Sequence, residues 1–182
     1  MVTPPRLPKT SWLPDWAAHD RAWSRLLHHR GAKPWLIATM VGVSRMSDGW
    51  IWYVAILGLP WFGGATGLPC ALRMTGLGLL NLWMYKTLKR YFARPRPFVA
   101  CNDVRARTRS LDEYSFPSGH TLHAVAFTNL LTAYYPLTHW PLWAFAGLVA
   151  LSRVVLGLHY LSDVLIGALL GFATAWAVLL LM

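Results

Sequence analysis

Long apolar stretches alternate with short polar segments along most of the chain. A helix that crosses a membrane needs about 20 predominantly apolar residues, with some latitude for tilt. The stretches that meet this requirement cover residues 46–63, 68–90, 119–135, 142–158 and 161–181. The pattern therefore predicts an all-α integral membrane bundle of five to six transmembrane helices.

The N-terminal segment, residues 1–33, differs from the rest of the chain. Residues 1–14 are rich in proline and predict an irregular conformation. Asp15–Arg30 predicts an amphipathic helix, because Trp16, Trp23 and two leucines form one side while arginines and histidines form the other. We expect this helix to lie on the membrane surface. No cleavable signal pattern is present in this segment, so the first span is expected to direct the chain to the membrane.

The region that follows, residues 34–182, is expected to form one transmembrane domain. Its first apolar stretch, residues 34–62, is interrupted by a polar cluster of Ser44, Arg45, Ser47 and Asp48. This stretch is too short for two full crossings. We therefore expect a short helix that dips into the membrane interface and is followed by the first span, residues 46–63.

The composition is that of a membrane protein. Apolar residues make up 55% of the chain and charged residues only 13%, whereas an ordinary soluble domain has about 25% charged residues. The 11 tryptophans in 182 residues are typical of the aromatic belts at the two faces of a bilayer. Cys70 and Cys101 support neither a disulfide framework nor a metal-ligand spacing.

The net charge of +10 is concentrated at two places between apolar stretches, residues 21–33 and residues 86–109. Nucleic acid is not expected as a partner, because the charges do not follow one polar face. Anionic lipid headgroups or a phosphate-binding site remain as explanations for the excess of basic residues.

Three polar clusters are expected to meet at one face of the membrane. The second of the five spans ends where a basic loop begins, and the third starts where that loop ends. The chain then crosses to the far side, returns through the fourth span and turns again at His159. The clusters around Lys89–Arg96, Ser118–His120 and Arg153–Asp163 should therefore share one membrane face.

The first cluster reads Lys89-Arg-Tyr-Phe-Ala-Arg-Pro-Arg96-Pro97. Lys89 falls at a helix end, and the prolines favour an extended segment around Arg96. Two cations fixed in this way suit a phosphoryl group, since arginine offers a planar fork and lysine a point charge. The alternative is a set of basic residues that flank a span and contact lipid headgroups.

The second cluster, Pro117-Ser118-Gly119-His120, predicts the start of a helix. Free backbone amides at such a start favour an anion. Gly119 lets the backbone approach a phosphate closely, and His120 is placed to protonate a leaving oxygen. The alternative is a plain helix cap beside an interfacial histidine.

The third cluster runs from Ser152 and Arg153 to His159 and Asp163. On a continuous helix His159 and Asp163 would share a face, because they are four residues apart. A carboxylate bonded to one ring nitrogen fixes the tautomer and leaves the other nitrogen free to attack. Arg153 lies between apolar stretches and needs an anionic partner, which a substrate phosphate would supply. The alternative is an interfacial His–Asp pair with an arginine that reaches toward water.

Together, the three clusters resemble the signatures of the type 2 phosphatidic acid phosphatase superfamily. Those signatures are Lys-x6-Arg-Pro, Pro-Ser-Gly-His and Ser-Arg-x5-His-x3-Asp. Every signature position is matched in order between Lys89 and Asp163. The apolar spans on either side also fit the helical background of this superfamily.

The resemblance implies a role for each matched residue. His159 is expected to be the nucleophile, Asp163 to orient it, and His120 to protonate the leaving group and later to activate water. The phosphate oxygens are expected to be bound by three cations, a hydroxyl and a backbone amide: Lys89, Arg96, Arg153, Ser118 and Gly119. No metal ion or other cofactor is expected, since members of the superfamily typically work without one and fixed cations can stabilise the transferred phosphoryl group.

The resemblance also implies a substrate and a location. The spans argue against the soluble acid phosphatases and vanadium haloperoxidases that share the signatures. Short membrane members act on lipid phosphates or diphosphates, and we expect undecaprenyl diphosphate, with phosphatidylglycerol phosphate or phosphatidic acid as alternatives, delivered sideways from the bilayer. A bacterial inner membrane with the site on the periplasmic face is implied, although the basic loop on that face conflicts with the positive-inside rule. The oligomeric state is not predicted.

Three other functions explain part of the pattern. A protein that only binds phospholipid headgroups would need the cations but not the histidines. A zinc enzyme would use His120, His123, His159 and Asp163 as ligands, and an acyltransferase would leave the cations unexplained. Outside the signatures, we expect His123 to pack within its helix, Arg94 to meet lipid phosphates, and Asp48 to pair with an arginine of the site.

Overall fold

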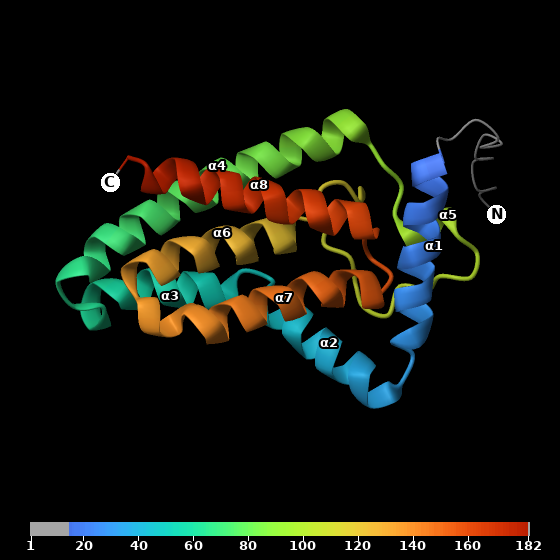
Figure 1. Cartoon of the computed structure of the whole chain (residues 1–182), viewed down its shortest axis with the longest axis horizontal. Coiled ribbons are helices and arrows are strands. Elements are labelled where there is room, and N and C mark those ends of the chain that lie inside the picture. The colour runs from blue at the N-terminus through green and yellow to red at the C-terminus, as the bar shows by residue number, and fades with distance from the viewer. Residues whose placement is uncertain (1–14, 182) are drawn as a thin grey trace.

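The computed structural model describes residues 15–181, and these residues contain helices and no strand (Figure 1). The helices are α1 (Asp15–Arg30), α2 (Pro34–Met46), α3 (Trp50–Phe62), η1 (Gly64–Thr66), α4 (Gly67–Phe92), α5 (Pro97–Ala100), α6 (Gly119–Tyr134), η2 (Pro136–Thr138), α7 (His139–Val155) and α8 (Leu161–Leu179). The all-α prediction is confirmed for these residues. The irregular segment expected over 1–14 lies outside them, and the domain boundary at residue 33 stays a prediction.

Helix α6 is the centre of the bundle. It packs against α4, α7 and α8, and its interface with α8 is the most extensive in the described residues. Figure 1 shows these four helices running along the long axis of the molecule, with α1 crossing one end. The core between α3, α4, α6 and α7 is made of apolar side chains such as Trp52, Met74, Leu77, Phe127 and Leu130.

Two glycines allow α8 to lie directly against α6. A Cβ on Gly171 would sit 2.3 Å from the Leu122 carbonyl oxygen, and one on Gly167 would sit 2.7 Å from the Ser118 carbonyl oxygen. Small residues permit this close approach of two helix backbones, as is common between membrane helices. The contact has a consequence for the site, because the Ser118 N–H donates to the Asp163 carbonyl at 3.0 Å. A backbone hydrogen bond therefore joins the second sequence cluster to the third.

The outer surface of the bundle is strongly apolar. Large exposed apolar side chains cover the outward sides of α3, α4, α7 and α8, among them Trp61, Phe62, Leu72, Trp83, Trp140 and Leu169. An apolar exterior of this extent is typical of contact with a membrane or a partner.

The five predicted spans coincide with α3, α4, α6, α7 and α8. Within residues 15–181, α8 is the one helix whose length and composition both suffice for a full crossing, and α3 is a shorter apolar helix. The short helix expected before residue 46 is α2. The number of helices that cross a membrane therefore stays a prediction.

Helix α1 has the predicted bounds, and the stripe of it that faces the protein is mostly polar. Its buried residues, Ala17, Asp20, Ser24 and His28, form one stripe, whereas Trp16 and Trp23 are 62% and 55% exposed. The stripe meets polar backbone groups at the helix ends beside it: Leu161 N–H donates to Ser24 Oγ, Ser162 N–H donates to Asp20 Oδ1, and His28 Nδ1 lies 3.0 Å from the Val155 carbonyl. Helix ends leave such groups without intrahelical partners. Polar side chains on α1 thus supply these partners and attach it to α7 and α8.

Candidate active site

Lys89 and Arg96 lie on either side of a turn that follows α4. The helix ends at Phe92, Ala93 adopts a left-handed conformation with φ 44°, and Arg96 is extended with φ −74° and ψ 155°. This extended segment is the one predicted from its flanking prolines. Both cationic side chains are buried, with relative exposures of 4% for Lys89 and 1% for Arg96.

One carboxylate oxygen contacts both cations. Lys89 Nζ donates to Asp112 Oδ1 at 2.8 Å and to the Tyr114 carbonyl at 2.7 Å. Arg96 Nη2 donates to the same oxygen, Asp112 Oδ1, and Arg96 Nε donates to the Asp112 carbonyl at 3.1 Å. The sequence clusters do not include Asp112, and only its place in the loop before Pro117 could have suggested it.

Arg96 also reaches the predicted nucleophile. Its Nη1 donates to the Leu158 carbonyl at 2.6 Å and lies 3.4 Å from His159 Nε2. The first and third sequence clusters therefore meet at this guanidinium.

His159 lies in a loop and not on a helix, which corrects the expected shared helical face with Asp163. Helix α7 ends at Val155, and Gly157 turns the chain with φ 75°, a conformation that favours glycine. The N–H groups of Leu158 and His159 both donate to the Arg153 carbonyl. The loop, rather than helical spacing, brings His159 back toward Asp163.

The side chains of His159 and Asp163 are close but not hydrogen-bonded. His159 Nδ1 and Asp163 Oδ2 are 3.5 Å apart, and Nδ1 has no hydrogen-bond partner in the described residues. Burial, followed by the positive charges of Arg96, Arg153 and Lys89, holds the pKa of His159 well below its usual range. The ring is therefore neutral at pH 7, which leaves one of its nitrogens without a proton.

Asp163 is fixed at the start of α8. Its Oδ2 accepts the Tyr160 N–H at 2.8 Å within a capping box, and its Oδ1 accepts from Arg94 Nη1 at 2.6 Å. The same guanidinium donates to Asp20 Oδ2 at 2.8 Å and to Ser162 Oγ at 2.7 Å, and it stacks over the Tyr160 ring. Arg94 therefore bridges two acidic side chains of the protein, which corrects the expectation that it meets lipid phosphates.

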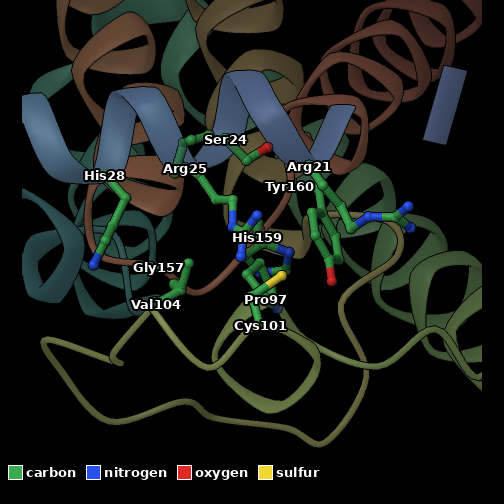
Figure 2. A pocket seen from close by; sticks show the side chains of 11 residues that line it. Arg21, Ser24, Arg25, His28, Pro97, Cys101, Val104, Gly157, His159 and Tyr160 are labelled. Atoms are coloured by element: carbon green, nitrogen blue, oxygen red, sulfur yellow. The ribbon is translucent and has the colours of Figure 1, made fainter. Parts of the chain in front are cut away.

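Helix α1 covers the side of the His159 loop that faces away from the bundle. Figure 2 shows α1 crossing the His159–Tyr160 segment, with Ser24 and Arg25 on the side that faces it. Residues of α1 and of this segment line one small pocket together. An interfacial position for α1 stays a prediction, but the helix also packs on the candidate site.

The second cluster begins α6 as predicted, with Ser118 as the N-cap. Ser118 Oγ is fully buried and lies 3.0 Å from Thr121 Oγ1. His120 Nε2 lies 2.7 Å from Asp48 Oδ1. Asp48 therefore pairs with a histidine of the site, and the expected pairing with an arginine is wrong.

Arg153 is 2% exposed. Its Nη1 donates to Ser44 Oγ, while Nε has no hydrogen-bond partner among the described residues. No carboxylate in residues 15–181 forms an ion pair with it. A buried guanidinium with free donors is suited to bind an anion that enters the site.

His123 packs within the bundle as expected. Its Nδ1 lies 2.9 Å from the Gly119 carbonyl, and its ring contacts Tyr85 and Phe127. In the described part of the chain, no three His, Cys, Asp or Glu side chains are grouped as metal ligands. The zinc alternative therefore has no support from the arrangement of these side chains.

A cavity of about 310 Å³ runs from the candidate site between α3, α4 and α6. Its polar end is formed by Asp48, Asp112 and His120. Its remaining walls are mostly apolar and include Trp52, Ile56, Met74, Leu79, Leu82 and Phe127. A cavity with one charged end and a long apolar wall suits a molecule with a polar head and an apolar tail.

The sequence matches a described family over most of its length. The family model of the PAP2 superfamily matches residues 70–182. Phosphatidylglycerophosphatase B of Bacillus subtilis is 30% identical over 160 residues, which cover 76% of this chain and 71% of the relative. Undecaprenyl-diphosphatase BcrC of Bacillus subtilis is 32% identical over 114 residues, covering 62% and 58%. Decaprenylphosphoryl-5-phosphoribose phosphatase of Mycobacterium tuberculosis is 34% identical over 154 residues, covering 80% of each chain.

Two solved structures have a similar fold. The transmembrane PAP2 type phosphatidylglycerolphosphate phosphatase from Bacillus subtilis aligns with a TM-score of 0.74 at 24% identity, covering 93% of this chain and 87% of the other. LpxE of Aquifex aeolicus aligns with a TM-score of 0.75 at 25% identity, covering 87% and 93%.

Proposed function

This chain belongs to the PAP2 superfamily, and we propose that it is a membrane lipid phosphatase that works through a phosphohistidine on His159. One observation carries the proposal. His159 Nε2 lies 3.4 Å from the guanidinium of Arg96, and Asp112, which accepts a hydrogen bond from that guanidinium, lines the polar end of a cavity with mostly apolar walls. A headgroup at the charged end would leave its lipid tail along the apolar wall.

The proposed reaction has two steps. His159 Nε2 attacks the phosphorus atom, a P–N bond forms, and the P–O bond to the lipid breaks. His120 gives its proton to the departing lipid oxygen, and Asp48 at 2.7 Å is placed to stabilise the protonated ring. Water, deprotonated by His120, then attacks phosphorus, the P–N bond breaks, and inorganic phosphate leaves.

The cations of the site would stabilise the charge on the transferred phosphoryl group. We assign this role to Lys89, Arg96 and Arg153, with Ser118 and the Gly119 amide as further contacts. Fixed charges in a buried site act strongly on a developing charge. Asp163, held by the Tyr160 N–H and Arg94, would orient His159 through Nδ1.

Four lipid classes are the candidate substrates: phosphatidic acid and the three for which relatives are named. The relatives are named for phosphatidylglycerophosphate, undecaprenyl diphosphate and decaprenylphosphoryl-5-phosphoribose. We favour undecaprenyl diphosphate, since the chain is similar in size to short phosphatases of that lipid. The apolar exterior of the bundle supports delivery of the substrate from within the bilayer.

Phosphate release from purified lipids tests the proposed function. The detergent-solubilised protein is incubated in EDTA with undecaprenyl diphosphate, phosphatidylglycerol phosphate, decaprenylphosphoryl-5-phosphoribose and phosphatidic acid. We expect release from at least one lipid, full activity in chelator, and inhibition by orthovanadate, which mimics a pentacoordinate phosphorus. A folded protein that releases phosphate from none of them would support headgroup binding without turnover. Activity that EDTA abolishes would favour a metal-dependent reaction.

We also propose that the protein lies in a bacterial inner membrane with the site on the outer face. Single cysteines test this orientation, because Cys70 and Cys101 are buried. A cysteine at Glu113, in the exposed loop beside the site, should react with an impermeant maleimide in intact cells. A cysteine at Leu137, which is 99% exposed at the opposite end of the bundle, should react only after lysis. The reverse result would place the site in the cytoplasm.

A further inference from the structure

Asp112 occupies a position that the proposed function reserves for phosphate. Its Oδ1 accepts from Lys89 Nζ at 2.8 Å and from Arg96 Nη2. These are the two cations of the first signature, and both are almost fully buried. Any phosphate oxygen that binds both of them must compete with this carboxylate.

The loop that carries Asp112 is held at both ends but not at its tip. At one end, Arg107 donates through its backbone N–H to Leu156 and through its side chain to the carbonyls of His28 and Gly31. At the other end, the Ser115 N–H donates to the Arg94 carbonyl at 2.9 Å. Residues 108–114 make no backbone–backbone hydrogen bond within the described part of the chain. The tip is therefore attached mainly through the groups that contact Lys89 and Arg96.

The electrostatics of the site keep this contact in place when no substrate is bound. Burial alone would raise the pKa of Asp112, but its hydrogen bonds and attraction to Lys89 and Arg96 hold its pKa below the usual range. A carboxyl group with a lowered pKa keeps its charge above that pKa and loses the contact only as the pH falls through it. At neutral pH the carboxylate must therefore be displaced by another anion rather than released by protonation.

We propose that Asp112 is a displaceable counter-anion of the phosphate site. It pairs with Lys89 and Arg96 while the site is empty, and it leaves with the loop tip when the phosphate of a lipid binds. The inference rests on the proposed function, because it takes these two cations as phosphate ligands. It goes further by assigning the loop a role in setting phosphate affinity.

The displacement has a second consequence at the cavity. Leu111 is 61% exposed and lines the cavity next to Asp112. When Asp112 leaves the cations, Leu111 moves away from the polar end of the cavity together with it. Binding of the headgroup and access to the apolar wall are thereby coupled.

Removing the charge of Asp112 tests whether this carboxylate competes with phosphate. Asp112→Asn keeps the size of the side chain but removes the charge that competes with phosphate. We expect the inhibition constants of orthovanadate and inorganic phosphate to fall about tenfold, and the KM for lipid to fall as well. Glu113→Gln is the matched control, because Glu113 is an exposed neighbour in the same loop and should leave these constants unchanged.

The outcomes separate this inference from the proposed function. An active Asp112→Asn enzyme with unchanged or weaker vanadate inhibition would overturn the inference, because Asp112 would then be a fixed part of the site. A wild-type protein that neither hydrolyses lipid nor responds to vanadate would overturn the proposed function instead. A fluorophore on a cysteine at Glu113, with Asp112 intact, gives an answer even if the asparagine variant does not fold. Its emission should shift when vanadate is added, and a constant emission in an enzyme that vanadate inhibits would again overturn the inference.

Discussion

The His159→Ala variant is expected to release no measurable phosphate from any lipid that the wild-type protein hydrolyses. The substitution removes Nε2, the atom proposed to attack phosphorus beside Arg96, and leaves the cations in place. Loss of a nucleophile in a comparable hydrolytic site lowers the rate by about 10⁶-fold. Phosphate release in the presence of EDTA measures the effect. With substrate labelled at the phosphorus atom, wild type should also yield an acid-labile protein adduct that the variant lacks.

The fold must be monitored separately, because His159 is 1% exposed. His159→Asn is closer in size to the native side chain and should have a melting temperature nearer to wild type, with the same loss of activity. His139→Ala is the matched control, since His139 is exposed at the other end of α7. Activity of either His159 variant within about tenfold of wild type would contradict the nucleophile assignment.

Sequence patterns predicted most of the helices and the regions that meet. The predicted apolar stretches coincide with α3, α4, α6, α7 and α8. They can be recognised in the sequence because apolar side chains recur along the whole length of such helices, both in the core and on the outer surface. Prolines around Arg96 and the Pro-Ser-Gly sequence before His120 fixed two local conformations by backbone chemistry alone. The expectation that the three polar clusters lie at one end of the bundle followed from the number of helices between them, since each helix takes the chain to the opposite end.

The partners of the charged residues were not predictable in the same way. Asp48 lies 72 residues from His120 in the sequence, and Asp20 lies 74 residues from Arg94. No periodicity links such pairs, because their contact depends on how helices cross and where loops turn. The expected partners of Asp48 and Arg94 were wrong for this reason. His159 and Asp163 are near in sequence, yet their contact depends on the φ of Gly157 and not on helical spacing.

Helix α1 shows a different limit of pattern analysis. The pattern assigns tryptophans to one side and arginines and histidines to the other, whereas the side that meets the protein carries Asp20, Ser24 and His28. In an ordinary soluble protein the apolar side would be buried. Here a polar stripe is buried, because it accepts hydrogen bonds from backbone N–H groups at the start of α8 and from Arg94 after α4, which apolar side chains could not do.

The Arg94→Gln variant is expected to lower kcat about 100-fold while KM changes by less than about threefold, since a small misplacement of a catalytic group has an effect of this size. Arg94 Nη1 donates to Asp163 Oδ1 at 2.6 Å, and Nη2 donates to Asp20 Oδ2 at 2.8 Å. Without the guanidinium, two buried carboxylates lose their common cation and repel each other. Asp163 then no longer holds its position beside His159. The phosphate ligands are untouched, so steady-state kinetics with lipid should show the loss in kcat alone.

Conservative variants distinguish positioning from a general loss of stability. Arg94→Lys keeps the charge but not the fork that bridges two carboxylates, so it should recover only part of kcat. Asp20→Asn removes one of the two carboxylates from α1 and should lower kcat less than Arg94→Gln does. Arg90→Gln is the matched control, because Arg90 is exposed near the same end of α4. A folded Arg94→Gln protein with wild-type kcat, or one whose KM alone increases, would show that Arg94 does not position Asp163.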